Sequence, residues 1–125
     1  MHKTKRSNKD LLEPINNRFK IAAEVWIYGD DLTGSTNAAA MRGSWYFVTV
    51  PKKTSEIINN RFGSYKRGWG SLPVEVIVGK TKWRTSIFPD RKIEAYLLPI
   101  KASVRKQEKI DNKDRLELEL KILVD

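Results

Sequence analysis

The side chains most able to do chemistry in this sequence are cations and tryptophans concentrated between residues 66 and 92. Arg and Lys donate hydrogen bonds to phosphate or carboxylate groups, and the indole ring of Trp offers a face on which a planar group can stack. This combination predicts a binding site for an anionic or polar ligand. The candidate ligand-binding residues are Lys66, Arg67, Trp69, Arg84 and Arg91.

The turn that contains Trp69 and a second group of cations, over residues 101–109, also have a simpler structural interpretation. Trp69 lies in a Gly-rich turn, and there it could fill one end of a β-barrel while its cationic neighbours stay in water. The recurrence of Lys101, Arg105 and Lys109 at every fourth position is typical of the solvent-exposed face of a short helix. The sequence alone leaves the binding and the structural interpretations open.

Most catalytic sites need residue types that this chain lacks or places badly. It has no cysteine, and its single histidine, His2, lies in a polar N-terminal segment that gives an imidazole nothing to hold it. Glu75 and Asp90 are carboxylates near the candidate cations, and pairing with those cations is the simpler role for each. We therefore expect no catalytic residues and no enzymatic activity. An enzyme that uses only carboxylates and Ser or Thr is the remaining alternative.

Two segments resemble ligand-binding loops but have the wrong spacing. Gly79-Lys80-Thr81 matches the end of a phosphate-binding loop, yet Val74 stands where that loop requires its first glycine. Asp30 and Asp31 begin an oxygen-rich stretch that lacks the central Gly and the final Glu of an EF-hand. We expect neither a metal ion nor a cofactor.

The net charge of +9 at pH 7 makes nucleic acid the main alternative partner, because polyanions are attracted to such a surface. Four of the cations fall in residues 1–16, which we expect to form a flexible basic arm that is either solvated or in contact with nucleic acid. These four are Lys3, Lys5, Arg6 and Lys9. Residues 17–125 have the length of a single domain.

The compartment is predicted from what the sequence lacks. No run of about 18 apolar residues is present, so we expect no membrane span. The basic N-terminal residues are not followed by the apolar core of a secretory signal. We therefore expect a cytoplasmic protein with no membrane partner.

Hydrophobic periodicity predicts a mainly β domain with two short helices. Strict alternation of apolar and polar residues over 115–124 indicates a strand with one buried face, and 19–28 shows the same pattern. The predicted strands are 19–28, 44–50, 74–78, 81–88, 95–100 and 115–124, and the predicted helices are 52–62 and 100–109.

The connections favour antiparallel pairing. Gly79-Lys80 is typical of a two-residue hairpin turn, Pro89-Asp90 predicts another turn, and Pro51 suits the start of a helix. The connection over 29–43 is long for a small domain, which indicates a mobile or functional loop. Hairpins at this density favour a closed antiparallel barrel, which also leaves no strand edge exposed.

Five segments in order resemble a bacterial family catalogued as the domain of unknown function number nineteen-oh-five, and the resemblance covers roughly residues 19–122. The segments are Trp45–Val48 (WYFV) followed by Pro51, Lys66–Gly70 (KRGWG), Leu72–Val76 (LPVEV), Trp83–Asp90 (WRTSIFPD) and Tyr96–Ala102 (YLLPIKA) with Val104-Arg105. It implies a small closed double-split β-barrel capped by helices, of the class shared with AbrB-like, MazE-like and MraZ-like proteins. Many of those relatives bind DNA. The family offers no catalytic residues to carry over.

We therefore expect a non-enzymatic β-barrel module that binds an anionic or polar ligand, with a nucleic-acid-binding protein of AbrB-like fold as the alternative. Relatives of this fold often build the barrel from two chains, whereas two hairpins could close it within one. Both a monomer and a homodimer are therefore compatible with the sequence.

Overall fold

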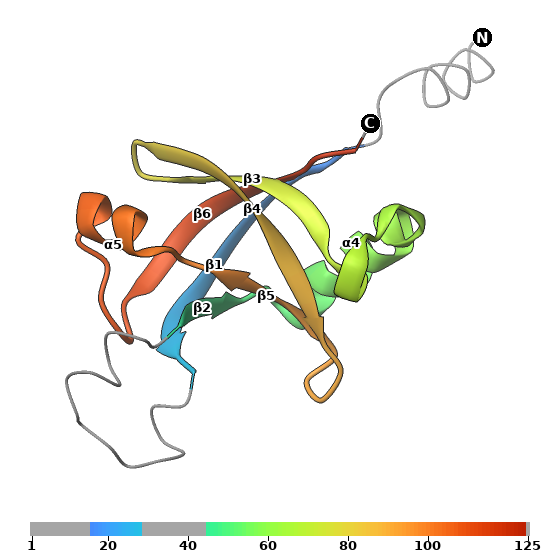
Figure 1. The fold of residues 1–125 in the computed structure, drawn as a ribbon, viewed down its shortest axis with the longest axis horizontal. Coiled ribbons are helices and arrows are strands. Elements are labelled where there is room, and N and C mark those ends of the chain that lie inside the picture. The colour runs from blue at the N-terminus through green and yellow to red at the C-terminus, as the bar shows by residue number, and fades with distance from the viewer. Residues whose placement is uncertain (1–15, 29–44, 125) are drawn as a thin grey trace, which may run out of the picture.

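The computed structural model describes residues 16–28 and 45–124, which form a closed six-stranded barrel with two α-helices (Figure 1). The mainly β fold predicted from the sequence is confirmed, and a single chain closes the barrel. His2, most of the predicted basic arm and the segment with Asp30 and Asp31 lie outside the described ranges.

The strand order around the barrel is β1-β2-β5-β4-β3-β6, and each pair of neighbours is antiparallel. The chain runs through β1 (Arg18–Ile27), β2 (Tyr46–Thr49), α4 (Lys52–Phe62), two short 3-10 helices (Gly63–Tyr65 and Gly68–Gly70), β3 (Leu72–Val78), β4 (Thr81–Asp90), β5 (Ala95–Pro99), α5 (Ala102–Glu108) and β6 (Arg115–Ile122).

Alternating residues of each strand fill the interior of the barrel, because successive side chains of a strand point to opposite faces. Along β6, every second residue from Leu116 to Ile122 is buried, whereas Arg115 and Glu117 are exposed. The same alternation buries Leu72, Val74, Val76 and Val78 of β3. The interior is thus filled by packed side chains, which leaves the outer surface of the barrel as the place to look for a site.

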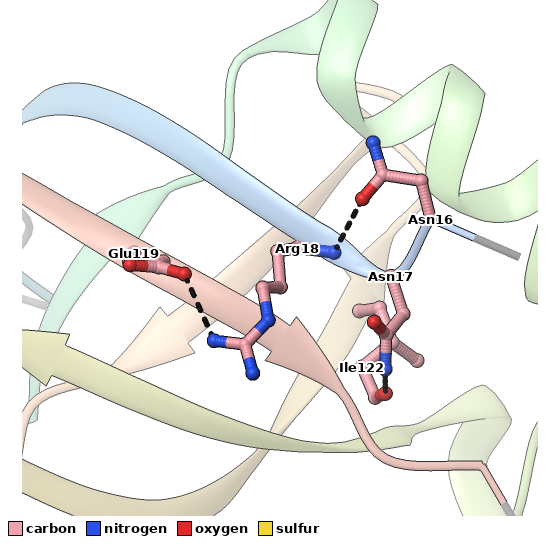
Figure 2. A network of polar contacts seen from close by, with 5 residues as sticks. All are labelled: Asn16, Asn17, Arg18, Glu119 and Ile122. Atoms are coloured by element: carbon pink, nitrogen blue, oxygen red, sulfur yellow. Dashed lines mark hydrogen bonds and ion pairs between the residues drawn. The ribbon is translucent and has the colours of Figure 1, made fainter. Parts of the chain in front are cut away.

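The seam between β1 and β6 closes the barrel and joins the first strand to the last. Seven residue pairs align the two strands, from Arg18 opposite Lys121 to Glu24 opposite Arg115. At the outer end of the seam, the Asn17 side-chain amide donates to the Ile122 carbonyl at 2.8 Å (Figure 2).

The end of the seam is also tied to its surroundings. The Arg18 guanidinium lies 3.3 Å from the Glu119 carboxylate, as Figure 2 shows. Arg61 of α4 donates to the Asn16 carbonyl at 3.0 Å. The helix is therefore anchored to the point where the barrel closes.

The helices lie on opposite sides of the barrel, with α4 on the right and α5 on the left in Figure 1. α4 begins directly after Pro51 and buries Ile58 and Phe62 against the core, and α5 buries Val104. Neither helix in residues 16–28 and 45–124 has the length and apolar character needed to cross a membrane.

The predicted turn at Pro89-Asp90 is wrong, because β4 continues through both residues and the turn lies at 91–94. The pairing of β4 with β3 ends at Ile87 opposite Leu72, so the last residues of β4 pair only with β5. Pro89 lies in this part of the strand, opposite Tyr96. A proline is tolerated there because one edge of the strand needs no N–H donor.

The predicted hairpin turn at Gly79-Lys80 is confirmed, and α5 packs against it. Gly79 has a φ of +56°, and a Cβ atom at this position would collide with the Glu108 carboxylate. That carboxylate accepts hydrogen bonds from the Lys80 amide at 3.3 Å and from the Thr81 hydroxyl. The glycine thus allows α5 to be fastened to the tip of the hairpin.

We expect Gly79→Ala to lower the free energy of unfolding by roughly 1 to 3 kcal/mol, because the variant combines a left-handed backbone with displacement of Glu108. Gly68→Ala is the matched control, since no atom lies within 4 Å of the added methyl group and its φ lies outside the left-handed region. Urea denaturation of both variants measures the difference, and equal stabilities would contradict this account of the turn.

Candidate functional site

A hydrogen-bonded turn displays Trp69 to solvent. The residue is 92% exposed, so the alternative that it fills one end of the barrel is wrong. Its φ of 63° is left-handed, a conformation that costs a non-glycine residue about 1 to 2 kcal/mol. The Arg67 amide donates to the Ser71 carbonyl at 2.8 Å, and the Gly70 amide donates to the Arg67 carbonyl at 2.9 Å. The surrounding turn therefore holds an unfavourable conformation that presents an indole to the outside.

Trp69 borders an open groove of about 1030 Å³ between α4 and the hairpin of β4 and β5. Gly70, with a φ of +74°, lets the turn approach this hairpin, because a Cβ atom there would lie only 3.0 Å from the Pro89 ring. The lining residues are Ser55, Glu56, Asn59, Lys66, Trp69, Gly70, Pro89, Asp90, Arg91, Glu94, Ala95 and Tyr96.

The floor of the groove is a hydrogen-bonded contact between α4 and β5. The Ser55 side chain is buried, donates to the Val50 carbonyl at 3.0 Å and accepts from the Tyr96 amide at 3.0 Å. The Tyr96 hydroxyl donates to the Asn59 side-chain oxygen at 3.1 Å. Burial raises the pKa of the Tyr96 phenol above its usual value, so the floor stays neutral at physiological pH.

The walls of the groove carry charges of both signs. Lys66 and Arg91 supply the cations, and Glu56, Asp90 and Glu94 supply the carboxylates. These five side chains offer both donors and acceptors, and the acidic groups outnumber the basic ones. The groove therefore suits a ligand with hydrogen-bonding groups of both kinds better than a polyanion.

Two of the three carboxylates already have contacts within the protein. Glu94 lies 3.1 Å from the Lys52 ammonium group at the start of α4, and Asp90 accepts a hydrogen bond from the Lys92 amide at 2.9 Å. In the part of the chain that the structure describes, no group of three His, Asp or Glu side chains is placed to hold a metal ion.

The model of the family described as domain of unknown function (DUF1905) matches residues 23–120, which reach from within β1 to within β6. The chain belongs to the DUF1905 family. The predicted membership of this family is thereby confirmed. No curated protein matches the chain significantly.

Three of the five predicted ligand-binding residues of this DUF1905 domain come together in the groove, namely Lys66, Trp69 and Arg91. Arg67 lies two residues before Trp69 in the same turn but does not line the groove. Arg84 lies elsewhere, on the outer face of β4, where its Nε atom is 3.9 Å from the Glu75 carboxylate. That contact agrees with the expected pairing of Glu75 with a cation.

Sequence reasoning missed the contribution of α4 to the DUF1905 groove. Glu56 and Asn59 are three residues apart, a spacing that places them on the same face of a helix. This signal was available from the sequence, but it does not reveal which part of the barrel the polar face meets. The role of Tyr96 was missed because its segment was predicted only as an apolar strand.

We expect Tyr96→Phe to be less stable than the wild type by about 1 kcal/mol at pH 7, because it loses the hydrogen bond to Asn59. The ordinary pKa of a tyrosine phenol is 10.0, and burial raises the pKa of Tyr96 in the folded protein above it. Just above pH 10.0, the Tyr96 phenol therefore ionises in the unfolded wild-type chain while it stays protonated in the folded protein. Ionisation of the unfolded chain lowers the free energy of unfolding of the wild type as pH rises, whereas Tyr96→Phe has no phenol to ionise at this position. The difference in stability between the two proteins should therefore shrink.

Urea denaturation at neutral pH and at several values above about pH 10 measures this change. Asn59→Ala is the matched control, because it removes the acceptor but keeps the buried phenol, and its alkaline loss of stability should resemble that of the wild type. A difference between Tyr96→Phe and the wild type that stays constant with pH would contradict burial as the cause.

Proposed function

We propose that this DUF1905 domain is a non-enzymatic binding module whose groove holds a polar ligand with a planar face against Trp69. The exposed, left-handed Trp69 carries the proposal. A large aromatic side chain gains little from such exposure, and a strained backbone at a surface turn is a reason to suspect function. A planar ligand stacked on the indole would recover the apolar burial that the unbound residue lacks.

The charges of the groove favour a polar ligand over an anionic one. A neutral polyhydroxylated or zwitterionic molecule can accept hydrogen bonds from Lys66 and Arg91 and donate to Glu56 and Asp90. A multiply charged anion would instead be repelled by the three carboxylates of the groove. Of the two ligand classes expected from the sequence, the polar class is therefore the better candidate.

Binding without catalysis is supported by the surroundings of the carboxylates. Glu75 faces Arg84 on the outer wall, and Asp90 shares the groove with Lys66 and Arg91. A general acid or base must be free to exchange protons with a substrate, whereas Glu75 is in contact with a cation and Asp90 lines a groove that also contains cations. The proposal accordingly assigns these carboxylates to ligand recognition.

Duplex DNA binding through an AbrB-like fold is the weaker candidate for the groove. Contacts to a phosphate backbone require a continuous positive surface, whereas here three carboxylates lie among two cations. The assignment of the barrel to the double-split class, and with it to AbrB-like proteins, remains a prediction from the resemblance.

The proposal is tested by titrating the protein with one probe of each class while the indole N–H signals are followed by NMR. Maltotriose serves as the neutral probe, glycylglycine as the zwitterionic probe and inorganic phosphate as the anionic probe. We expect a polar probe to shift the Trp69 signal. Trp69→Leu should weaken binding roughly 5- to 100-fold, since stacking on an aromatic ring contributes about 1 to 3 kcal/mol.

Trp45→Leu is the matched control, because Trp45 is also exposed but does not line the groove. It should bind the polar probe as tightly as the wild type. The proposal fails if no probe moves the Trp69 signal, or if Trp69→Leu binds every probe with wild-type affinity.

A further inference from the structure

A second, smaller pocket lies where β5 leads into α5, away from the Trp69 groove. It has a volume of about 270 Å³ and shares no lining residue with the groove. Its walls combine aromatic and cationic side chains with a hydroxyl group from β4. The lining residues are Trp45, Tyr46, Thr85, Pro99, Ile100, Lys101, Ala102 and Arg105.

The guanidinium group of Arg105 is fixed within this pocket. Its Nε atom donates to the Ile100 carbonyl at 3.1 Å, and its central carbon lies 3.7 Å from the centre of the Tyr46 ring. The interpretation of Lys101, Arg105 and Lys109 as a uniformly exposed stripe is therefore wrong for Arg105, which is half-buried. A guanidinium group that is held through its Nε atom and its planar face can still use its two terminal nitrogens for a bidentate contact with a phosphate or carboxylate group.

The indole of Trp45 is also supported, although it is 61% exposed. It lies nearly parallel to the Phe47 ring, at an angle of 12° and a centroid distance of 6.1 Å. Phe47 in turn packs against Trp26 at 5.1 Å, and the Trp26 N–H donates to the Thr49 hydroxyl at 2.9 Å. The exposed indole is thus supported by Phe47, which is itself packed against Trp26, and it offers a planar surface to a ligand.

The charge of this pocket differs from that of the groove. Lys101 and Arg105 are its charged lining residues, and both are positive. More cations lie on the same helix, at the residue that follows it and on the hairpin that Glu108 contacts, namely Lys106, Lys109, Lys80 and Lys82. Nineteen of the 24 Lys and Arg residues and ten of the 15 Asp and Glu residues lie in residues 16–28 and 45–124, so these ranges carry the whole net charge of +9.

We propose that this pocket binds a nucleobase–phosphate unit, with the base stacked on Trp45 and the phosphate held by Arg105 and Lys101. A fixed arginine fork matches phosphate oxygens, and an exposed ring stacks bases of any kind. The pocket is too small for a duplex but has room for one such unit. Its two sources are a free nucleotide and a single-stranded nucleic acid, and the further cations of the α5 region and of the β3–β4 hairpin favour the latter.

The test measures binding of adenosine monophosphate, adenosine and inorganic phosphate by calorimetry, and of a fluorescent single-stranded oligodeoxyadenylate by anisotropy at several salt concentrations. We expect adenosine monophosphate to bind more tightly than adenosine or phosphate alone. Tighter binding of the oligonucleotide than of the mononucleotide identifies single strands as the source, and the reverse order identifies free nucleotides.

Two variants separate the two contacts. Trp45→Leu should weaken binding roughly 5- to 100-fold at every salt concentration, because stacking is not ionic. Lys101→Gln should weaken oligonucleotide binding and reduce the slope of log K against log salt by about 0.7, the contribution of one phosphate in a single strand. Lys106→Gln, a change at an exposed lysine of the same helix that does not line the pocket, should change affinity less than twofold.

Trp69→Leu distinguishes this site from the groove, since the variant should retain wild-type affinity for the nucleotide probes. The proposal is overturned if neither the mononucleotide nor the oligonucleotide binds. It is also overturned if Trp45→Leu and Lys106→Gln lose affinity equally, because the attraction would then be a general effect of net charge. Matching thermal unfolding profiles ensure that each loss of affinity reflects the site and not the fold.

Discussion

The antiparallel seam between β1 and β6 is the contact on which the rest of the structure depends. These two strands are the ends of the sheet order, so their pairing converts an open sheet into a barrel. Closure places β4 and β5 in fixed positions, and the bond from Arg61 to Asn16 ties α4 to the same seam. Both walls of the Trp69 groove are therefore positioned by the pairing of strands that lie at opposite ends of the sequence.

A barrel whose interior is filled by side chains has only its outer surface for recognition. The Trp69 groove and the smaller pocket lie at irregular segments beside the helices, and they differ in chemistry. The groove beside α4 has a neutral hydrogen-bonded floor and walls of both charges, whereas the pocket beside α5 is positive and aromatic. Each pocket has one exposed tryptophan, and in each case neighbouring structure fixes the position of the ring, through turn hydrogen bonds for Trp69 and ring stacking for Trp45.

Local patterns in the sequence predicted the strands and helices well, but they did not predict the contacts between segments that lie far apart in the chain. The alternation that predicted β6 and the Pro51 signal that predicted the start of α4 depend on neighbouring residues, and the structure confirms both. The positions of Pro89, Trp69 and Arg105 depend on partners far along the chain, such as β5, the turn around Gly70 and Tyr46. The composition of the groove could not be predicted for the same reason, since α4 and the β4–β5 hairpin meet only in the folded barrel.

The seam also determines how the domain responds to mechanical force. Asn17 and Ile122 lie at the outer end of the antiparallel pair, where the start of β1 meets the end of β6. A force applied through the two ends of the chain therefore separates the paired residues of β1 and β6 one pair after another. The force then acts on one hydrogen-bonded residue pair at a time instead of being shared by all the pairs along the two strands. Force applied along this direction would therefore open the barrel first at the end of the seam to which α4 is anchored.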